Sequence, residues 1–413
     1  RKIVDKVELG NGKTFTGMSV NSFTSKGDKF PLIRGQAAST ECDEVSASLC
    51  ANTCLDPSLV NGKIVVCGES TGYKEAFRAG AHGAVSLASD ENDVSFIVPL
   101  PAVTLNMPAY DDVVSYLNST RAPVANILKS ESINDTSAPV VASFSSRGPN
   151  AVAGDILKPD IAAPGVDILA AYSPIASVAA DVGDKRRSSF NVLSGTSMAC
   201  PHVAGAVAYL KSLHPNWSPS ALKSALMTTA RSMSPSDNPD GEFAYGSGHL
   251  DPIRATNPGL VYEATKNDYV AFLCKFGYSD DEIRLITGDK SSCPRRTTKT
   301  SSPTDVNYPS ISAGITKKKG SFNVTFQRTV TNIGVANSTY VAKIEPQKGS
   351  KINVTVTPNT LSFMALKEQK LFEVTVVGEA KDLSPTIPVS ASLVWSDGIH
   401  SVRSPIVVYS GSA

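Results

Sequence analysis

One stretch carries most of the information in this sequence: Ser194-Gly195-Thr196-Ser197-Met198-Ala199-Cys200-Pro201-His202-Val203-Ala204-Gly205. Residues 198–213 are apolar nearly all round, which predicts a central buried helix. Ser197 lies at the start of that helix, beside the positive end of its dipole. There its backbone N–H can help to stabilise an oxyanion. The alternative interpretation is an ordinary serine that caps a helix.

Strands and helices alternate around this stretch, as in an α/β domain. Residues 140–144 predict a strand that ends at Ser145-Ser146-Arg147-Gly148-Pro149, and residues 160–165 predict a strand and a turn. After the central helix, Ser218 can cap another helix whose first residue is Pro219.

The first 135 residues predict a hairpin followed by a separate α/β or β-rich unit. Residues 3–23 form the hairpin, because Asn11-Gly12 supplies the positive φ angles of a tight turn. In the next unit, prolines place one of the strands at a sheet edge. The strands are expected at residues 63–67, 84–87 and 98–105 (the edge strand), and the helices at residues 73–80 and 111–117.

The C-terminal part is rich in β-structure. Residues 322–326, 354–356, 372–376 and 392–395 alternate between apolar and polar side chains, and turn signals separate them. This pattern predicts an antiparallel sandwich of roughly seven strands.

Composition excludes several classes of function. The chain has 413 residues, 41% hydrophobic and 19% charged, with a net charge of +1. A basic nucleic-acid groove and an acidic tail are therefore not expected. No apolar run reaches the length of about 18 residues that a membrane span needs, and no apolar signal core follows the N-terminal charges.

Cysteine usage favours an oxidising compartment. Seven cysteines are present: Cys42, Cys50, Cys54, Cys67, Cys200, Cys274 and Cys293. We expect three disulfides, with Cys42–Cys54, Cys50–Cys67 and Cys274–Cys293 as the favoured pairs, although the first four cysteines allow three connectivities. Cys200 is expected to be a small buried apolar residue. The spacing contains no matched pair of C-x-x-C motifs, so we expect no zinc site.

Six sequons for N-glycosylation occur, where chance alone gives about four. The sequon at Asn216 lies in a poor context before Trp217-Ser218-Pro219 and is expected to be bare. Together with the paired cysteines, the others favour a secreted glycoprotein. The expected sites are Asn118, Asn134, Asn323, Asn337 and Asn353.

The stretch around Ser197 closely resembles the nucleophile motif of the subtilisin-like serine peptidases, the subtilases. Several other segments look like motifs of the family or of its plant, cucumisin-like members, so the resemblance covers essentially the whole chain. They are residues 145–149 and 158–165, residues 55–57 and 61–67 (similar to the protease-associated domain), residues 243–249 and 307–310.

The resemblance implies a fold and its division into domains. We expect an α/β, subtilisin-like parallel-sheet catalytic domain, represented by its second half. The implied parts are residues 1–25 (catalytic-domain hairpin), 26–135 (inserted protease-associated domain), 136–300 (serine-bearing half of the catalytic domain) and 301–413 (fibronectin type III-like β-sandwich).

The sequence departs from the family in one important respect. A subtilase needs an Asp, a His and an oxyanion-hole Asn, and in the family all three precede the point where this chain begins. His202 is about 7.5 Å along the helix and about 140° around it from Ser197, beyond the reach of a base. It is expected to be buried, and His82 and His400 to be exposed. None of the five histidines lies in the family's histidine motif: His82, His202, His214, His249 and His400.

We therefore expect a serine endopeptidase that acts on protein substrates and is incomplete as a lone chain. Ser197 is the expected nucleophile, and Gly195 and Thr196 border the leaving-group side of the groove. A second polypeptide supplies the Asp, the His and the Asn. No metal or cofactor is expected.

Other interpretations remain open. The stretch at Ser197 also resembles a nucleophile elbow, so that Ser197, Asp237 or Asp240, and His249 would be the triad of an α/β-hydrolase. A non-catalytic glycoprotein that binds proteins, or a degraded peptidase without activity, are further possibilities.

Overall fold

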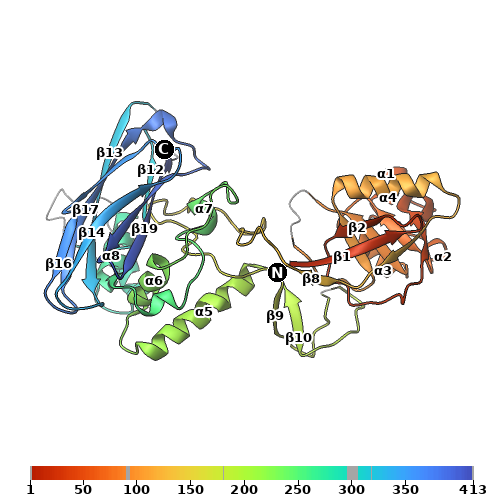
Figure 1. The fold of residues 1–413 in the computed structure, drawn as a ribbon, viewed down its shortest axis with the longest axis horizontal. Coiled ribbons are helices and arrows are strands. Elements are labelled where there is room, and N and C mark those ends of the chain that lie inside the picture. Colours follow the sequence, from red (N-terminus) through yellow and green to blue (C-terminus); the bar gives the residue numbers. More distant parts are fainter. Residues whose placement is uncertain (1, 90–93, 180, 295–305, 318, 412–413) are drawn as a thin grey trace. The chain divides into compact units, whose positions relative to one another are not determined.

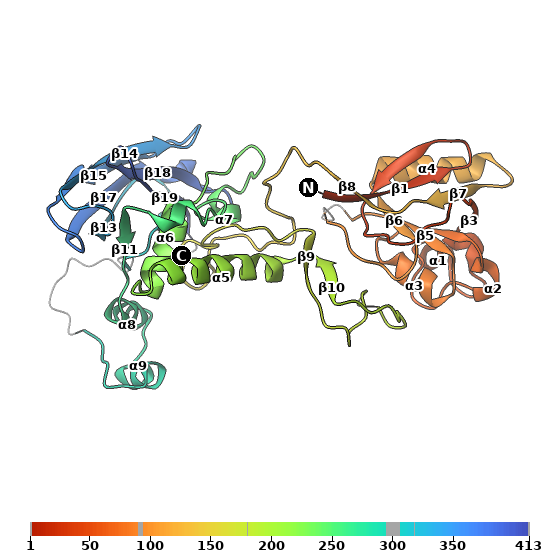
Figure 2. The same ribbon diagram turned by 60° about the horizontal axis from the view of Figure 1, so that its bottom comes forward.

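A computed structural model describes residues 2–89, 94–179, 181–294, 306–317 and 319–411 of the chain. The chain folds into two compact units, drawn in Figures 1 and 2. The first unit comprises residues 1–138, 142–144 and 164–198. The second comprises residues 139–141, 145–163 and 199–413.

The first unit is built on one mixed sheet in the order β2-β1-β7-β3-β4-β5-β6, with β8 paired to β1. The predicted hairpin forms and joins this sheet, so no break in the sheet coincides with residue 25. Strands β3 to β6 run parallel, and β6 is last in this order, as expected of an edge strand. It is shorter than predicted, since it begins at Ala102, after Pro99 and Pro101. The strands are β1 (Lys2–Leu9), β2 (Thr14–Gly17), β3 (Phe30–Arg34), β4 (Ile64–Cys67), β5 (Gly83–Leu87), β6 (Ala102–Leu105), β7 (Val124–Ile127) and β8 (Glu131–Ile133).

Helices cover both faces of this sheet. Helix α3 (Gly72–Arg78) packs on one face through Ala76, and α4 (Met107–Ser119) packs on the other through Val113. Helix α4 begins earlier than predicted, because the Asn106 side chain accepts the Ala109 N–H at 3.1 Å and caps it.

Two disulfides lie in the first unit and one in the second. The structure joins Cys42 to Cys54, Cys50 to Cys67 and Cys274 to Cys293, the pairing that the sequence favoured. Cys50 and Cys67 are buried beside the short helices α1 (Glu44–Ser48) and α2 (Pro57–Val60). These bridges restrict the unfolded chain and so stabilise the folded one.

The C-terminal part of the second unit is a β-sandwich around the buried Trp395. One sheet has the order β11-β13-β17-β15 and the other β12-β19-β18-β14-β16. The sandwich is mixed rather than purely antiparallel, because β12 runs parallel to β19. The strands are β11 (Leu260–Tyr262), β12 (Ile311–Ile315), β13 (Ser321–Asn332), β14 (Ser338–Pro346), β15 (Asn353–Thr357), β16 (Thr360–Phe363), β17 (Gln369–Glu379), β18 (Val389–Ser396) and β19 (Ser401–Ser410).

Helix α5 (Thr196–Leu213) is less buried than its sequence predicted. Ala206 and Leu210 on one face pack against α6 (Pro219–Thr228), which Ser218 caps as expected. Cys200, near the start of the helix, and Tyr209, near its end, are both exposed. The prediction of a buried Cys200 was wrong, because the described part of α5 before Ala206 contains no buried residue. The described residues of the second unit also form the α-helices α7 (Glu242–Tyr245), α8 (Lys266–Lys275) and α9 (Asp280–Thr287).

Two predicted strands do not form. Residues 140–144 have no β-structure, and Ile161 and Ala162 make only isolated bridges, to Gly246 and His249. A strand needs a continuous ladder of backbone partners, and the described residues provide only these two isolated ones. The expected parallel sheet around the serine is therefore not present in this part of the chain.

A carboxyl group is buried in the sheet of the first unit. Asp5 on β1 is fully buried, and the Ser19 hydroxyl lies within hydrogen-bonding distance of both the Asp5 carboxyl and the Ala102 carbonyl. A hydroxyl has only one proton to donate, so both contacts are satisfied together when Asp5 carries a proton. Burial raises the pKa of Asp5 to about 7, although the Ser19 contact lowers it.

This geometry predicts a pH-dependent stability for the first unit. The pKa of Asp5 is raised from 3.8 to about 7 on folding. Its contribution to the free energy of unfolding is therefore complete below pH 3.8 and is lost as the pH rises toward 7, by roughly 4 kcal/mol in total. Asp5→Asn should remove this loss. Both tryptophans lie in the second unit, so β1 should be followed by hydrogen exchange. Equal pH slopes in Asp5→Asn, in the exposed control Asp28→Asn and in the parent would contradict the prediction.

Candidate active site

A two-stranded ribbon in the first unit leads to Ser197. Strands β9 (Ile168–Ala171) and β10 (Phe190–Leu193) pair antiparallel, with Ile168 opposite Leu193. Beyond β10 the chain enters α5 after only two residues, so Ser197 is the second residue of the helix. Its side chain is exposed.

Hydrogen bonds at the base of the ribbon hold the segment before Ser197. The Asp167 N–H donates to the Ser194 hydroxyl at 2.9 Å, and the Gly195 N–H donates to the Gly165 carbonyl at 2.8 Å. The Met198 N–H then donates to the Gly195 carbonyl at 3.0 Å, which closes the first turn of α5.

The backbone of Ser197 is suited to binding an oxyanion. Within the described residues of the first unit, neither its N–H nor its hydroxyl makes a hydrogen bond. The first N–H groups of a helix have no partner within the helix, and together with the dipole they favour a negative charge at this point. The predicted nucleophile therefore stands where a tetrahedral oxyanion can be stabilised. Gly195 and Thr196 adjoin it.

Asp167 is a site residue that the sequence did not reveal. Its carboxylate Oδ2 accepts the Ile3 N–H of β1 at 2.8 Å, and its backbone adopts a positive φ of 53°. Burial raises the pKa of Asp167, against the hydrogen bond from Ile3. The available signal was a lone carboxylate within the apolar run of residues 162–180.

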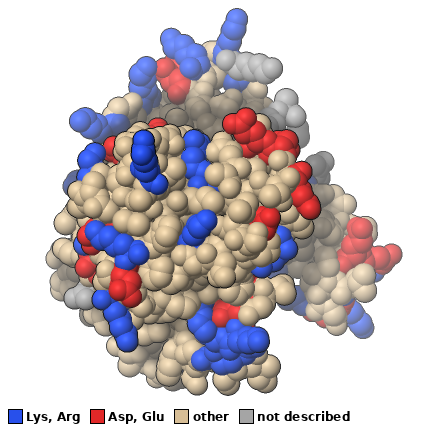
Figure 3. Space-filling view, turned by 90° about the vertical axis from the view of Figure 1, so that its right-hand side faces the viewer, with Lys and Arg blue, Asp and Glu red and all other residues tan. Residues whose placement is uncertain are grey.

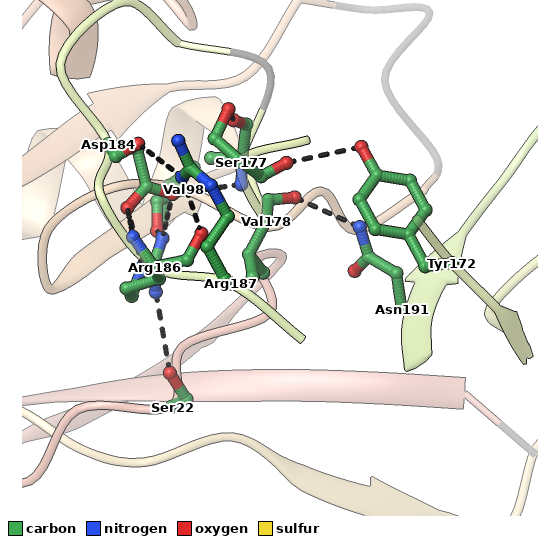
Figure 4. A network of polar contacts seen from close by, with 10 residues as sticks. Ser22, Val98, Tyr172, Ser177, Val178, Asp184, Arg186, Arg187 and Asn191 are labelled. Atoms are coloured by element: carbon green, nitrogen blue, oxygen red, sulfur yellow. Dashed lines mark hydrogen bonds and ion pairs between the residues drawn. The ribbon is translucent and has the colours of Figure 1, made fainter. Parts of the chain in front are cut away.

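The connection between β9 and β10 carries a dense polar network, shown in Figure 4. Arg186 forms two hydrogen bonds of 3.0 Å with the Asp184 carboxylate and one of 2.6 Å with the Val98 carbonyl. Its guanidinium carbon lies 4.8 Å from the centre of the Phe23 ring. Burial alone would raise the pKa of Asp184, but hydrogen bonds from Arg186 and from the Ala179 N–H lower it to about 2.

The surroundings of the histidines differ from those of a catalytic base. In the first unit, His82 is half-buried and stacks on Phe30 with ring centres 3.4 Å apart, so the expected exposed loop position was wrong. His202 on α5 is exposed rather than buried. His214 contacts the Thr256 carbonyl at 2.9 Å and stacks on Trp217.

His400 and His249 are structural residues of the second unit. His400 was expected to be exposed, but it is only 6% exposed, because its Nδ1 is held 2.7 Å from Asp397 beneath the hairpin. His249 directs its Nδ1 toward the Leu250 carbonyl at 3.1 Å.

The triad of the rival interpretation is not assembled. Asp240 pairs with Arg147 at 2.8 Å, and within the described residues of the second unit no hydrogen bond joins His249 to Asp237 or Asp240. This geometry gives no support to an α/β-hydrolase.

Two of the motifs that resemble the family meet in the second unit. Lys158 lies 2.7 Å from Asp160, and the Tyr308 hydroxyl donates to the other oxygen of Asp160. Burial raises the pKa of Tyr308 above its ordinary value, and the neighbouring Asp160 raises it further. This cluster is structural, since it joins the segment before β9 to the start of the sandwich.

Among the described residues, no group of His, Cys, Asp or Glu is arranged to hold a metal ion. In the same residues, no helix is both long and apolar enough to cross a bilayer. Positive and negative side chains both occur across the face in Figure 3, as expected for a chain with a net charge of +1.

Comparison with known proteins identifies the class. The model of the subtilase family matches residues 36–248, and that of a fibronectin type-III domain matches residues 305–408. The chain therefore belongs to the subtilase family of serine peptidases and carries a C-terminal fibronectin type III-like domain.

Individual relatives agree with this assignment. The chain is 50% identical to the subtilisin-like protease SBT4.13 of Arabidopsis thaliana over 99% of its own length and 55% of the relative's. It is also 50% identical to SBT4.4 of the same plant, over 100% of its length and 55% of the relative's. This chain thus spans about half the length of the curated relatives it matches.

A solved structure is similar only in part. The psychrophilic subtilisin-like protease Apa1 from the Antarctic Pseudoalteromonas sp. AS-11 matches 62% of this chain and 49% of its own, at 13% identity and a TM-score of 0.22. The family assignment therefore rests on sequence.

Cys200 offers a direct check of the exposed face of α5. Six cysteines are in disulfides and Cys200 is exposed, so about one thiol per chain should react with Ellman's reagent without denaturant when the folded chain is free of other polypeptides. Cys200→Ser should abolish this reaction. A thiol that reacts only after unfolding would contradict the exposure of α5.

Proposed function

We propose that this chain is the serine-bearing part of a secreted serine endopeptidase that hydrolyses peptide bonds in proteins. Family membership supports a serine peptidase. The observation that carries the proposal is the position of Ser197, exposed at the start of α5 with a backbone N–H that has no partner among the described residues of its unit.

The reaction follows from that position. The Ser197 hydroxyl attacks the scissile carbonyl, and a histidine, itself oriented by an aspartate, accepts its proton and passes it to the leaving amine. The Ser197 N–H and an asparagine amide hold the oxyanion. Water then cleaves the acyl-enzyme. Gly195 and Thr196, immediately before the nucleophile, border the leaving-group side of the groove.

A second polypeptide supplies the histidine, the aspartate and the asparagine. Without a base, a serine hydroxyl is a weak nucleophile, and His82 of the same unit stacks on Phe30 instead. The chain spans only 55% of the length of its relatives, which leaves room for such a part in the whole protein.

Exposed apolar surface near the serine supports this partner. The open face of α5 includes Ala204, Ala208 and Tyr209, the last of them 44% exposed. On the ribbon, Leu169 is 69% exposed and Phe190 62%. Soluble proteins rarely leave large apolar surfaces uncovered, and the small residues of α5 permit close packing of another backbone.

Secretion and the protease-associated domain are part of the same proposal. Three disulfides fit an oxidising compartment, and residues 26–135 are the proposed protease-associated domain. All five favoured sequons have exposed asparagines. Asn323 and Asn353 lie on the neighbours of β17, and both pair with Val377, so their glycans would share one outer face.

The glycans can be tested by mass. Asn323→Gln and Asn353→Gln should each remove one glycan, and the double substitution two, from protein produced in a secretory host. Asn216→Gln should leave the mass of the carbohydrate unchanged. Carbohydrate retained in full after both substitutions would contradict these sites.

A fluorophosphonate probe tests the peptidase. In the native sample, intact-mass analysis should find a second, smaller chain bound non-covalently and one probe on Ser197. Ser197→Ala should not react, whereas Ser212→Ala, an exposed serine of the same helix, should react like the parent. The separated 43.4 kDa chain should react at least about a thousandfold more slowly.

The outcomes distinguish the candidate functions. A single folded, monomeric chain that reacts at full rate contradicts the second polypeptide. A native sample that has the second chain but never reacts contradicts the peptidase and favours a protein-binding glycoprotein. Protection of Cys200 from Ellman's reagent in the native sample would locate the second chain on α5.

A further inference from the structure

We propose that Asp167 is a positioning residue for Ser197. It anchors the segment before Ser197 to strand β1. The inference rests on the proposed function and extends it to a residue outside the expected triad. All of the contacts involved lie within the first unit.

Asp167 connects two segments that are distant in the sequence. Its side chain accepts the Ile3 N–H at 2.8 Å, and its own N–H donates to the Ser194 hydroxyl at 2.9 Å. Ile3 belongs to β1, which pairs with β8 at Ile3 and with β2 and β7 further along the strand. These two contacts hold Ser194, three residues before Ser197, in a fixed position relative to the sheet of the first unit.

The backbone at Asp167 explains why an aspartate suits this place. Its φ of 53° lies in the left-handed region, which Asp and Asn tolerate better than other residues with a side chain. Glycine would accept the same backbone but offers no acceptor to Ile3. Asparagine would keep both the backbone and an oxygen acceptor, which makes it the conservative variant.

A second anchor holds the other end of the same ribbon. Arg186, in the loop between β9 and β10, donates to the Val98 carbonyl at 2.6 Å and is fixed by Asp184. Figure 4 shows Arg186 reaching toward Ser22, at 3.5 Å, from this loop. The ribbon is therefore fastened at both ends, whereas its apolar side chains Leu169 and Phe190 are exposed.

The neighbouring Arg187 provides a matched control for Arg186. Its guanidinium donates to the Asp184 and Arg186 carbonyls at 3.1 and 2.9 Å, both within its own loop. Arg187→Ala should therefore leave the ribbon fastened, whereas Arg186→Ala should loosen it.

Hydrogen exchange of the chain tests the anchoring role of Asp167 independently of activity. In Asp167→Gly, amides of residues 190–198 should exchange about tenfold faster than in the parent, as the loss of one such hydrogen bond implies. Asp167→Asn, Arg187→Ala and the exposed control Asp28→Gly should remain within about twofold of the parent. Arg186→Ala should accelerate exchange in the loop at residues 172–189. Exchange at the parental rate in Asp167→Gly would overturn the proposal.

Saturation kinetics with the fluorophosphonate test the consequence for Ser197 in the assembled protein. Asp167→Gly should lower the maximal rate of Ser197 modification about tenfold, with the half-saturating probe concentration unchanged, and Asp167→Asn should restore it. Partial unfolding would instead lower the modified fraction without changing its rate. An unchanged rate in Asp167→Gly, or an Asp167→Asn as slow as Asp167→Gly, overturns the positioning role. If the unmutated protein does not react with the probe, the proposed function is contradicted instead. Hydrogen exchange then decides whether Asp167 anchors the segment before Ser197.

Discussion

The hydrogen bond from the Asp167 N–H to the Ser194 hydroxyl is the contact on which the site depends. It closes the base of the β9–β10 ribbon at the point where the chain turns into α5. A serine nucleophile has to be held within a fraction of an ångström of its productive position. A two-stranded ribbon alone is only marginally stable, so the additional contacts at Asp167 and Arg186 supply the rigidity that the ribbon itself lacks.

The exposed surfaces of the chain have a common physical explanation. Helix α5 is apolar around its circumference, yet among its described residues only Ala206 and Leu210 are buried. The ribbon likewise presents Leu169 and Phe190 to solvent. Such surfaces are costly to leave in water, about 25 cal/mol for each Å² of apolar area. This cost is one of the grounds for the proposed second polypeptide.

Buried polar groups in the two units are nearly all paired, and the exceptions are informative. His400, Asp397 and Tyr340 form one connected cluster beneath the end of the sandwich. Even so, the His400 Nε2 has no partner among the described residues, and neither does one carboxylate oxygen of Asp5. The cluster at His400 is a structural network, whereas burial keeps the Asp5 carboxyl group neutral below its raised pKa of about 7.

Local patterns in the sequence were sufficient for the elements that depend on near neighbours. The cap at Ser218 and the alternating strands of the sandwich formed as predicted, because each is specified within a few residues. The first hairpin also formed, but of Asn11 and Gly12 only Gly12 has the predicted positive φ. The serine at the start of α5 also follows from sequence, through a motif shared with a family. Only the tertiary structure placed Asp167 between Ile3 and Ser194 and left residues 140–144 without a strand. Those outcomes depend on which distant backbone groups are available as partners, and no local pattern contains that information.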